Sequence, residues 1–265
     1  MYKEYLPSAA LWPYIESYWV FDSIVGEEQT VRVLPDGCVD ILLNCNEKSP
    51  NNALPPFCPY IVGTMTTFSD VTYHPIKMIG IRFKPGGITA FIRTPIHELT
   101  DQSIKMNLIE TIFDQTQFQD TLTEKKNLLE MINYINFYLL RQLNNVNIPD
   151  KQIMTAVNLI KQNNGCLPVR ELLNEVCLSQ RQFERKFKSA IGITPKVFSS
   201  VIRMLTDYCN NNPNRVFSSL LLNVDITIMH ILSGNINGSP EILQNNNNVD
   251  FIHKKRIIVS LSLSP

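Results

Sequence analysis

The stretch Pro168 to Arg203, PVRELLNEVCLSQRQFERKFKSAIGITPKVFSSVIR, predicts three short helices separated by turns. Ser179 followed by Gln182 is a capping-box pattern, which predicts that a helix begins there. Gly192 is typical of a helix end, and Thr194-Pro195 supplies an N-cap and a first residue for the next helix. Before Ser179, apolar residues recur at the i, i+3, i+4 and i+7 positions of one helical face: Val169, Leu172, Leu173 and Val176.

The helix predicted over Ser179 to Ile191 is basic on one side and apolar on the other. Arg181, Arg185 and Lys188 share one side at about 100° per residue. The opposite side carries apolar residues: Phe183, Phe187, Ala190 and Ile191. Two helices joined by a short turn, with the second apolar inside and basic outside, form a helix-turn-helix. An ordinary helical hairpin with a solvated basic face fits the same pattern.

The segment Leu178 to Lys196, LSQRQFERKFKSAIGITPK, resembles the first helix-turn-helix of the AraC/XylS family of bacterial transcription regulators. That family's string is LS-x-R-x-hydrophobic-x-R-x-F-K…G-x-x-P. The residues that match it are Ser179, Arg185, Phe187, Lys188, Gly192 and Pro195. The resemblance implies a sequence-specific regulator of transcription that binds double-stranded DNA, uses no cofactor and is not an enzyme. It leaves open whether a small-molecule effector or a second identical subunit also binds.

Arg181 and Arg185 are the candidates for base contacts, because arginine pairs bidentately with O6 and N7 of guanine in the major groove. Gln180 and Lys196 are at predicted helix N-termini, where phosphate contacts are common. The buried brace behind the helix is expected to include Leu172, Val176, Phe183 and Phe187. The complete candidate DNA-binding set is Ser179, Gln180, Arg181, Gln182, Glu184, Arg185, Lys188 and Lys196.

Composition favours a globular chain of one large or two ordinary domains. The 265 residues are 44% hydrophobic, which is ample for a core. No stretch is long and apolar enough for a membrane span, and the N-terminus lacks a signal-peptide pattern, so we expect a cytoplasmic protein. Four scattered histidines predict no metal cluster. Six cysteines without C-x-x-C spacing are expected to be reduced core thiols: Cys38, Cys45, Cys58, Cys166, Cys177 and Cys209.

The net charge of zero hides an uneven distribution. Residues 1–150 carry 11 basic and 17 acidic side chains, a net charge of −6. Residues 151–209 carry 9 basic and 4 acidic side chains, a net charge of +5. A basic module attached to an acidic one is consistent with a polyanion that contacts only the basic module.

The N-terminal half is rich in short strand patterns separated by turns. A short helix over Ala10 to Tyr18 is expected to bury Leu11, Ile15 and Trp19. A helix after Gly87 is expected to bury Ile88, Phe91 and Ile92. The strands are predicted at Gln29 to Val33, Cys38 to Asn44, Tyr60 to Met65, Asp70 to Tyr73 and Lys77 to Phe83. The first two of these strands are predicted to form a hairpin through Pro35-Asp36-Gly37.

Three segments of this half, YIESYW, VLPDGCVDILLN and IGIRFKPGG, resemble an uncharacterised N-terminal domain in one branch of the AraC-like regulators. The family's better-known N-terminal domains are cupin-like barrels that bind effectors or dimerise. A more distant alternative is an enzyme, because Cys38 and Asp40 share one face of a strand. The favoured interpretation is a buried thiol beside Asp36, a turn aspartate that caps its own backbone.

These patterns predict an α+β protein in three parts. Residues 1–143 form a small β-rich, barrel- or cupin-like regulatory or dimerisation domain that ends in a helix over Phe118 to Leu143. That helix is interrupted near Lys125-Lys126, and it docks on the barrel or pairs with a second subunit. A linker over Asn144 to Pro149 precedes residues 150–209, which are all-α and contain the first helix-turn-helix behind a leading helix at Lys151 to Lys161. Residues 210–265 are a degraded second helix-turn-helix and tail.

The degraded second motif suggests a pair of compensating frameshifts. Members of the resembled family carry a second helix-turn-helix similar to C-G-Y-x-D-x-x-H-F-x-R-x-F-K followed by G-x-S-P. With permitted codons, a shifted frame across Leu222 to Asn237 spells KCGYYDYAHFIREYK, and GSPE resumes in frame at Gly238. The alternative function is therefore an effector-binding or protein-interaction module whose DNA binding is impaired by loss of that motif.

Overall fold

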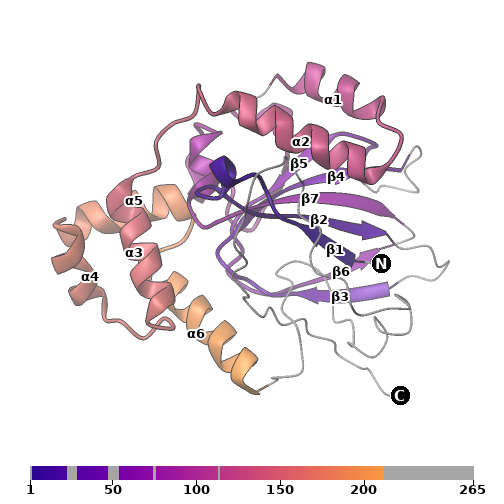
Figure 1. Cartoon of the computed structure of the whole chain (residues 1–265). Coiled ribbons are helices and arrows are strands. Elements are labelled where there is room, and N and C mark those ends of the chain that lie inside the picture. Colours follow the sequence, from indigo (N-terminus) through magenta and orange to yellow (C-terminus); the bar gives the residue numbers. More distant parts are fainter. Residues whose placement is uncertain (1, 23–28, 47–53, 74–75, 113, 212–265) are drawn as a thin grey trace, which may run out of the picture.

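The computed structural model describes residues 2–22, 29–46, 54–73, 76–112 and 114–211. Within this part of the chain, an antiparallel β region comes first and a helical region follows (Figure 1). The predicted α+β class is confirmed. The segment Leu222 to Asn237, on which the frameshift hypothesis rests, lies outside the described residues.

The β region consists of two antiparallel sheets. The larger has the strand order β1-β2-β7-β4-β5-β8, and the smaller pairs β3 with β6. The strands of the larger sheet are β1 (Tyr2–Tyr5), β2 (Ile15–Asp22), β7 (Lys77–Phe83), β4 (Val39–Asn44), β5 (Pro59–Val62) and β8 (Ser103–Lys105). The smaller sheet contains β3 (Gln29–Val33) and β6 (Ser69–Tyr73).

Two of the predicted local structures are wrong. Ala10 to Tyr18 is not a helix, because only the 3-10 turn η1 (Ala9–Leu11) precedes strand β2. Strand β2 lies between β1 and β7 within the sheet, and residues on both of its faces are buried. Its sequence therefore lacks the alternation of polar and apolar residues that marks a half-exposed strand. The expected burial of Leu11, Ile15 and Trp19 is nevertheless correct.

The predicted hairpin between β3 and β4 is also wrong. Strand β3 pairs with β6, and β4 pairs with β5 and β7. The turn at Pro35-Asp36-Gly37 carries the chain from one sheet to the other, so it connects two strands that do not pair. The helix expected after Gly87 is the 3-10 helix η2 (Gly87–Ala90), and it buries Ile88, Phe91 and Ile92 as predicted.

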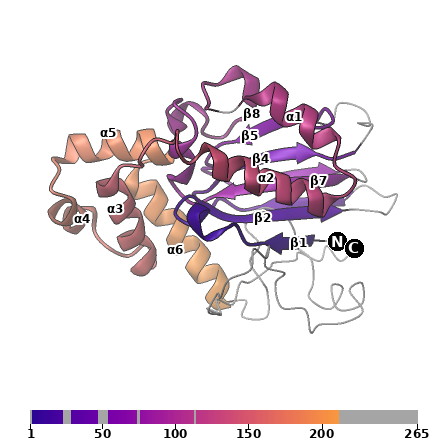
Figure 2. The same cartoon turned by 45° about the horizontal axis from the view of Figure 1, so that its top comes forward.

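Helices α1 (Gln115–Thr123) and α2 (Leu128–Gln142) lie across one face of the larger sheet (Figure 2). Their apolar faces join the core of that sheet, where Leu122, Ile132 and Ile135 are fully buried. The predicted interruption near Lys125-Lys126 is confirmed, because Asn127 caps α2 by accepting a hydrogen bond from the backbone N–H of Glu130. Short 3-10 helices η3 (Ile96–Glu98) and η4 (Met106–Leu108) complete the region.

The helical region has a core of its own. Its helices are α3 (Lys151–Gln162), α4 (Val169–Val176), α5 (Gln180–Ile191) and α6 (Pro195–Asn211). Helix α3 turns its predicted face of Ile153, Val157 and Ile160 inward. Among the described residues, no helix combines the length and apolar character that crossing a bilayer requires.

Candidate nucleic-acid interface

The turn between α4 and α5 is made by a left-handed residue. Cys177 has φ 52° and ψ 44°, and its N–H donates to the carbonyl oxygen of Leu173 at 3.1 Å. This ends α4 within one residue and lets Ser179 begin the next helix. Cys177 and Cys166 are exposed, so the prediction of core thiols is wrong for these two. Cys45 is buried, and the remaining three, Cys38, Cys58 and Cys209, are partly buried; all six are free.

Helix α5 begins with the predicted capping box. The hydroxyl of Ser179 accepts from the backbone N–H of Gln182 at 3.4 Å, and the Gln182 side-chain oxygen accepts from the N–H of Ser179 at 3.3 Å. This exchange satisfies donors that the first turn of a helix otherwise leaves unpaired. At the start of α6, the hydroxyl of Thr194 accepts a hydrogen bond from the backbone N–H of Val197, as its predicted N-cap role requires.

The inner face of α5 is fixed by aromatic packing. Phe187 is fully buried, with its ring centroid 5.5 Å from that of Phe183 and 5.7 Å from that of Phe198. Leu172 and Val176 of α4 belong to the same core. The brace predicted from sequence is therefore present, and it leaves α5 only its outer face for contacts with other molecules.

All eight candidate DNA-binding residues are exposed. The side chains of Ser179 and Gln182 are engaged in the cap, and Gln180 donates to the Glu184 carboxylate at 2.9 Å. Four cations remain, and within the described part of the chain none of them forms an ion pair: Arg181, Arg185, Lys188 and Lys196. The outer face of α5 and the start of α6 thus present cations that form no ion pair with any residue the structure describes.

One cation of α5 has a structural role that the sequence analysis missed. Lys186 lies between the inner and outer faces, and its ammonium contacts the Asp150 carboxylate at 2.8 Å. Asp150 also caps α3 by accepting from the N–H of Gln152, whose side chain donates to the carbonyl oxygen of Val176 at 2.6 Å. The cluster ties α3, α4 and α5 together. An aspartate in an N-cap position, such as Asp150, can be recognised from local sequence. Its partner Lys186 lies 36 residues away, and no local pattern identifies the two residues as a pair.

Partial burial raises the pKa of Asp150, but the Lys186 ammonium and the two capping N–H groups oppose it more strongly. The net result is a pKa below the usual value for an aspartate. Asp150 is therefore ionised at neutral pH, as its ion pair with Lys186 requires.

The C-terminal end of α5 is held by the β region. The Thr64 hydroxyl donates to the carbonyl oxygen of Ile191 at 2.5 Å, and the Thr100 hydroxyl donates to that of Gly192 at 2.8 Å. Gly192 has φ +95°, and a Cβ at this position would lie 3.0 Å from both hydroxyl oxygens. These contacts orient α5 relative to the β region, and no sequence pattern predicted them.

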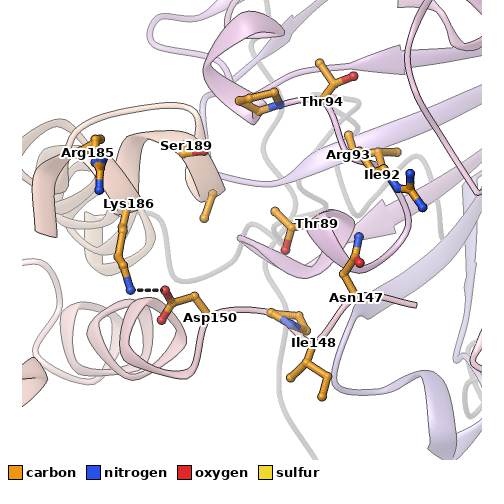
Figure 3. Close-up of a pocket in the computed structure, with 13 residues that line it drawn as sticks. Thr89, Ile92, Arg93, Thr94, Asn147, Ile148, Asp150, Arg185, Lys186 and Ser189 are labelled. Carbon is orange, nitrogen blue, oxygen red and sulfur yellow. Dashed lines mark hydrogen bonds and ion pairs between the residues drawn. The ribbon is translucent and has the colours of Figure 1, made fainter. Parts of the chain in front are cut away.

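A cavity of about 540 Å³ lies at this junction (Figure 3). One wall comes from α5, through Arg185, Lys186, Ser189 and Ala190. The rest comes from residues 89–95 of the β region and from the linker residues 147–150. Arg185, a candidate base-contacting residue, therefore also faces a concave site shared by both regions.

Cys38 and Asp40, the two residues that raised the possibility of an enzyme, do not form an activated nucleophile. The backbone N–H of Cys38 donates to the Asp36 carboxylate at 2.9 Å, as the favoured interpretation predicted. Burial, with Asp36 nearby, raises the pKa of the Cys38 thiol to about 12. Asp40 accepts from the indole of Trp19 at 3.0 Å and lies 3.6 Å from the Arg82 guanidinium. Among the described residues, no group of three or more His, Cys, Asp or Glu side chains is placed to hold a metal.

Comparison with known proteins gives one family match. Residues 3–105 match a domain of unknown function, DUF6597, in agreement with the expected uncharacterised N-terminal domain. No curated protein matches the chain. Among solved structures, the chain is similar to a lysine-to-alanine variant of apo ToxT from Vibrio cholerae, with 9% identity, a TM-score of 0.33, and coverage of 91% of this chain and 94% of that one. A TM-score this low supports no conclusion about this chain.

Proposed function

We propose that the chain is a sequence-specific, double-stranded-DNA-binding transcription regulator of the AraC type, with α5 in the major groove. The supporting observation is the two-faced construction of α5. Its inner face is fixed by Phe183 and Phe187, and its outer face presents Arg181, Arg185 and Lys188 without acidic partners in the described residues. A braced helix with free cations is what major-groove binding requires.

The residues of the interface take different roles in this proposal. Arg181 and Arg185 contact base edges, because a guanidinium pairs bidentately with guanine. Lys188 borders the same face, and Gln182 and Glu184 flank it. Gln180 and Lys196 contact phosphates, which set the position of the protein on the duplex and carry no sequence information.

The domain organisation proposed here assigns regulation or dimerisation to residues 1–143, DNA binding to residues 150–209, and a degraded second motif to residues 210–265. With one helix-turn-helix, the chain contacts one major groove and binds DNA weakly. The coding DNA tests the frameshift: codons for Leu222 to Asn237 that do not spell the family motif in the shifted frame would exclude it.

The second candidate function is an effector-binding module with impaired DNA binding. The observation that favours it is the junction cavity, which places Arg185 beside residues of the β region. Selection of duplexes from a random pool by the full-length chain distinguishes the two functions. Enrichment of a common sequence, with affinity that falls steeply as salt rises, supports the regulator. Absence of enrichment, combined with ligand binding, supports the second function.

A further inference from the structure

A buried cluster of charges lies on the side of the β region that contacts α6. Its centre is Arg82 of β7, whose guanidinium contacts the Asp36 carboxylate and lies 3.6 Å from that of Asp40. The Arg82 side chain is 1% exposed, and those of Asp36 and Asp40 are 12% and 3% exposed. The indole N–H of Trp19 donates to Asp40 at 3.0 Å. Two carboxyl groups therefore share one guanidinium in a place from which water is largely excluded.

The three segments that resemble an uncharacterised N-terminal domain meet at this cluster. Trp19 belongs to YIESYW, Asp36 and Asp40 belong to VLPDGCVDILLN, and Arg82 belongs to IGIRFKPGG. Strand β7 pairs with both β2 and β4, which brings the three segments side by side. The resemblance therefore includes a set of polar residues that act together, besides the apolar core of the sheet.

The charges of the cluster balance only when one carboxyl group is protonated. With both carboxylates ionised, Asp36, Asp40 and Arg82 together carry one buried negative charge, which is costly to keep out of water. Asp36 makes the closer contact with Arg82, and Asp40 is the more deeply buried of the two. Burial raises the pKa of Asp40 to about 7; attraction to Arg82 opposes this rise and repulsion by Asp36 adds to it. Asp40 is therefore the group that takes up the proton.

The neighbours of Asp40 come from several elements of the described chain. Burial disfavours the charged form of Arg82, but the two aspartates outweigh it and raise its pKa, so Arg82 stays charged. The Cys38 thiol stays neutral, because its pKa is about 12. The titratable and charged groups that act on Asp40 or on its partners are Tyr2 and Glu4 of β1, Asp36 and Cys38 of the turn, Arg82 of β7 and Lys161 of α3.

The turn that carries Asp36 touches the core of the helical region. Gly37 has φ +78°, and a Cβ at this position would clash with the ring of Phe198 in α6. Phe198 is fully buried, and its ring centroid lies 5.7 Å from that of Phe187 in α5. The pairing of Asp36 with Arg82 thus holds the turn against a ring that braces the proposed recognition helix.

We propose that Asp40 is a proton switch for the contact between the turn Pro35 to Cys38 and α6. With a proton on Asp40, Arg82 pairs with Asp36 alone, and the turn is held against Phe198. Loss of the proton adds a second anion beside Arg82, which weakens the hold on the turn and loosens α6. We further infer that DNA affinity falls as the proton is lost. This last statement rests on the proposed function; the switch does not.

NMR of the carboxyl carbons in the folded, full-length wild type tests the proton site directly. One carboxyl resonance is expected to titrate near neutral pH, far above the range of an ordinary aspartate. That resonance should be missing from Asp40→Asn. If no carboxyl group of the wild type titrates above about pH 6, the proposal is wrong.

The pH dependence of stability gives a second test. Because the pKa of Asp40 is raised in the folded chain, the stability that its proton contributes is complete below the unfolded pKa, near 4. It is lost as the pH rises through the folded pKa, about 7. Asp40→Asn cannot release this proton. Its urea midpoint, relative to that of the wild type, should therefore rise between about pH 5.5 and pH 8.5. An equal difference at both pH values would overturn the proposal.

Asp70→Asn is the matched control for this test. Asp70 also pairs with an arginine, Arg32 at 2.7 Å, but both side chains are about two-fifths exposed. The hydrogen bond from Arg32 lowers the pKa of Asp70, so this carboxylate stays ionised throughout the range. The difference between Asp70→Asn and the wild type should therefore be the same at both pH values. A rise equal to that of Asp40→Asn would show that the effect is not specific to the buried cluster, and the proposal would fail.

Hydrogen exchange of the α6 backbone amides tests whether the proton reaches the helices. At about pH 8.5, exchange should be several-fold faster in the wild type than in Asp40→Asn, and at about pH 5.5 it should be equal. Equal exchange at both pH values would exclude a switch. DNA titration then follows the same two proteins, and Asp40→Asn should bind several-fold more tightly only at the higher pH. If α6 responds but the chain binds no DNA at either pH, the proposed function fails and the switch stands.

Discussion

The two ends of α5 are stabilised in different ways. Its first turn is capped by its own residues, Ser179 and Gln182, three positions apart. Its last turn is capped by Thr64 and Thr100, which are 127 and 92 residues away from the carbonyl groups they contact. The existence of the helix is therefore determined locally, whereas its position against the β region is determined by tertiary contacts.

The largest expected effect is on the brace behind α5. Phe187→Ala should lower the free energy of unfolding by about 3–5 kcal/mol, because it leaves a cavity among Phe183, Phe198 and the α4 residues. Urea denaturation measures the change. Phe137→Ala is the matched control, since Phe137 is 57% exposed on α2 and its loss creates no buried cavity. A Phe187→Ala variant as stable as Phe137→Ala would show that packing on the inner face of α5 does not stabilise the folded state.

The next effect is on the distant end of α5. Thr64→Val should cost about 1–3 kcal/mol, because the buried carbonyl oxygen of Ile191 loses its donor. Thr64→Ser keeps the hydroxyl and is the control. If the two variants are equally stable, the hydroxyl does not hold α5, and the contrast between the two ends disappears.

The N-terminal end of α5, which is capped by its own residues, should be less sensitive to substitution. Ser179→Ala should cost about 1 kcal/mol through loss of the N-cap. The two ends lie roughly 18 Å apart along the helix, so the effects of Ser179→Ala and Thr64→Val on the free energy of unfolding should add. Denaturation of the double variant measures this. A coupling well above 0.5 kcal/mol would show that the two ends are not independent.

The smallest effect concerns the pair between Asp150 and Lys186. Because the pKa of Asp150 is lowered in the folded chain, its contribution to stability is complete above the unfolded pKa, near 4. It is lost as the pH falls through the lower, folded pKa. Lys186→Met should cost about 0.2–1 kcal/mol at pH 7, as expected for an ion pair that solvent still screens, since both side chains are partly exposed. It should also reduce the loss of stability as the pH falls below the unfolded pKa, near 4. If Lys186→Met loses stability in acid as steeply as the wild type does, the ion pair does not lower the pKa of Asp150.

The same contrast explains which features the sequence predicted. In the helical region, the cap at Ser179, the end at Gly192 and the inward Phe183 and Phe187 depend on residues within one or two turns of each other. Local patterns were therefore sufficient. In the β region, most strands were located, but β3 and β4 were paired wrongly because their partners are distant in sequence. The burial of β2 on both faces likewise removed the alternation that would have identified it as a strand.

The candidate site was predicted only in part. The exposed residues of α5 follow from its helical period, so their placement needed no tertiary information. Lys186, Thr64 and Thr100 were missed because each acts on a group far away in sequence. The cavity beside Arg185 was also missed, since it exists only where the linker and residues 89–95 meet α5.

The most direct test of the account is base discrimination by the full-length chain. Duplexes selected from a random pool, and scrambled versions of them, are compared by titration for the wild type, Arg181→Ala, Arg185→Ala and Lys196→Ala. Each arginine variant is expected to lose about 1–3 kcal/mol of preference for the selected sequence. Lys196→Ala should weaken all duplexes alike and reduce the salt dependence. Unchanged discrimination in both arginine variants would contradict the claim that α5 contacts bases.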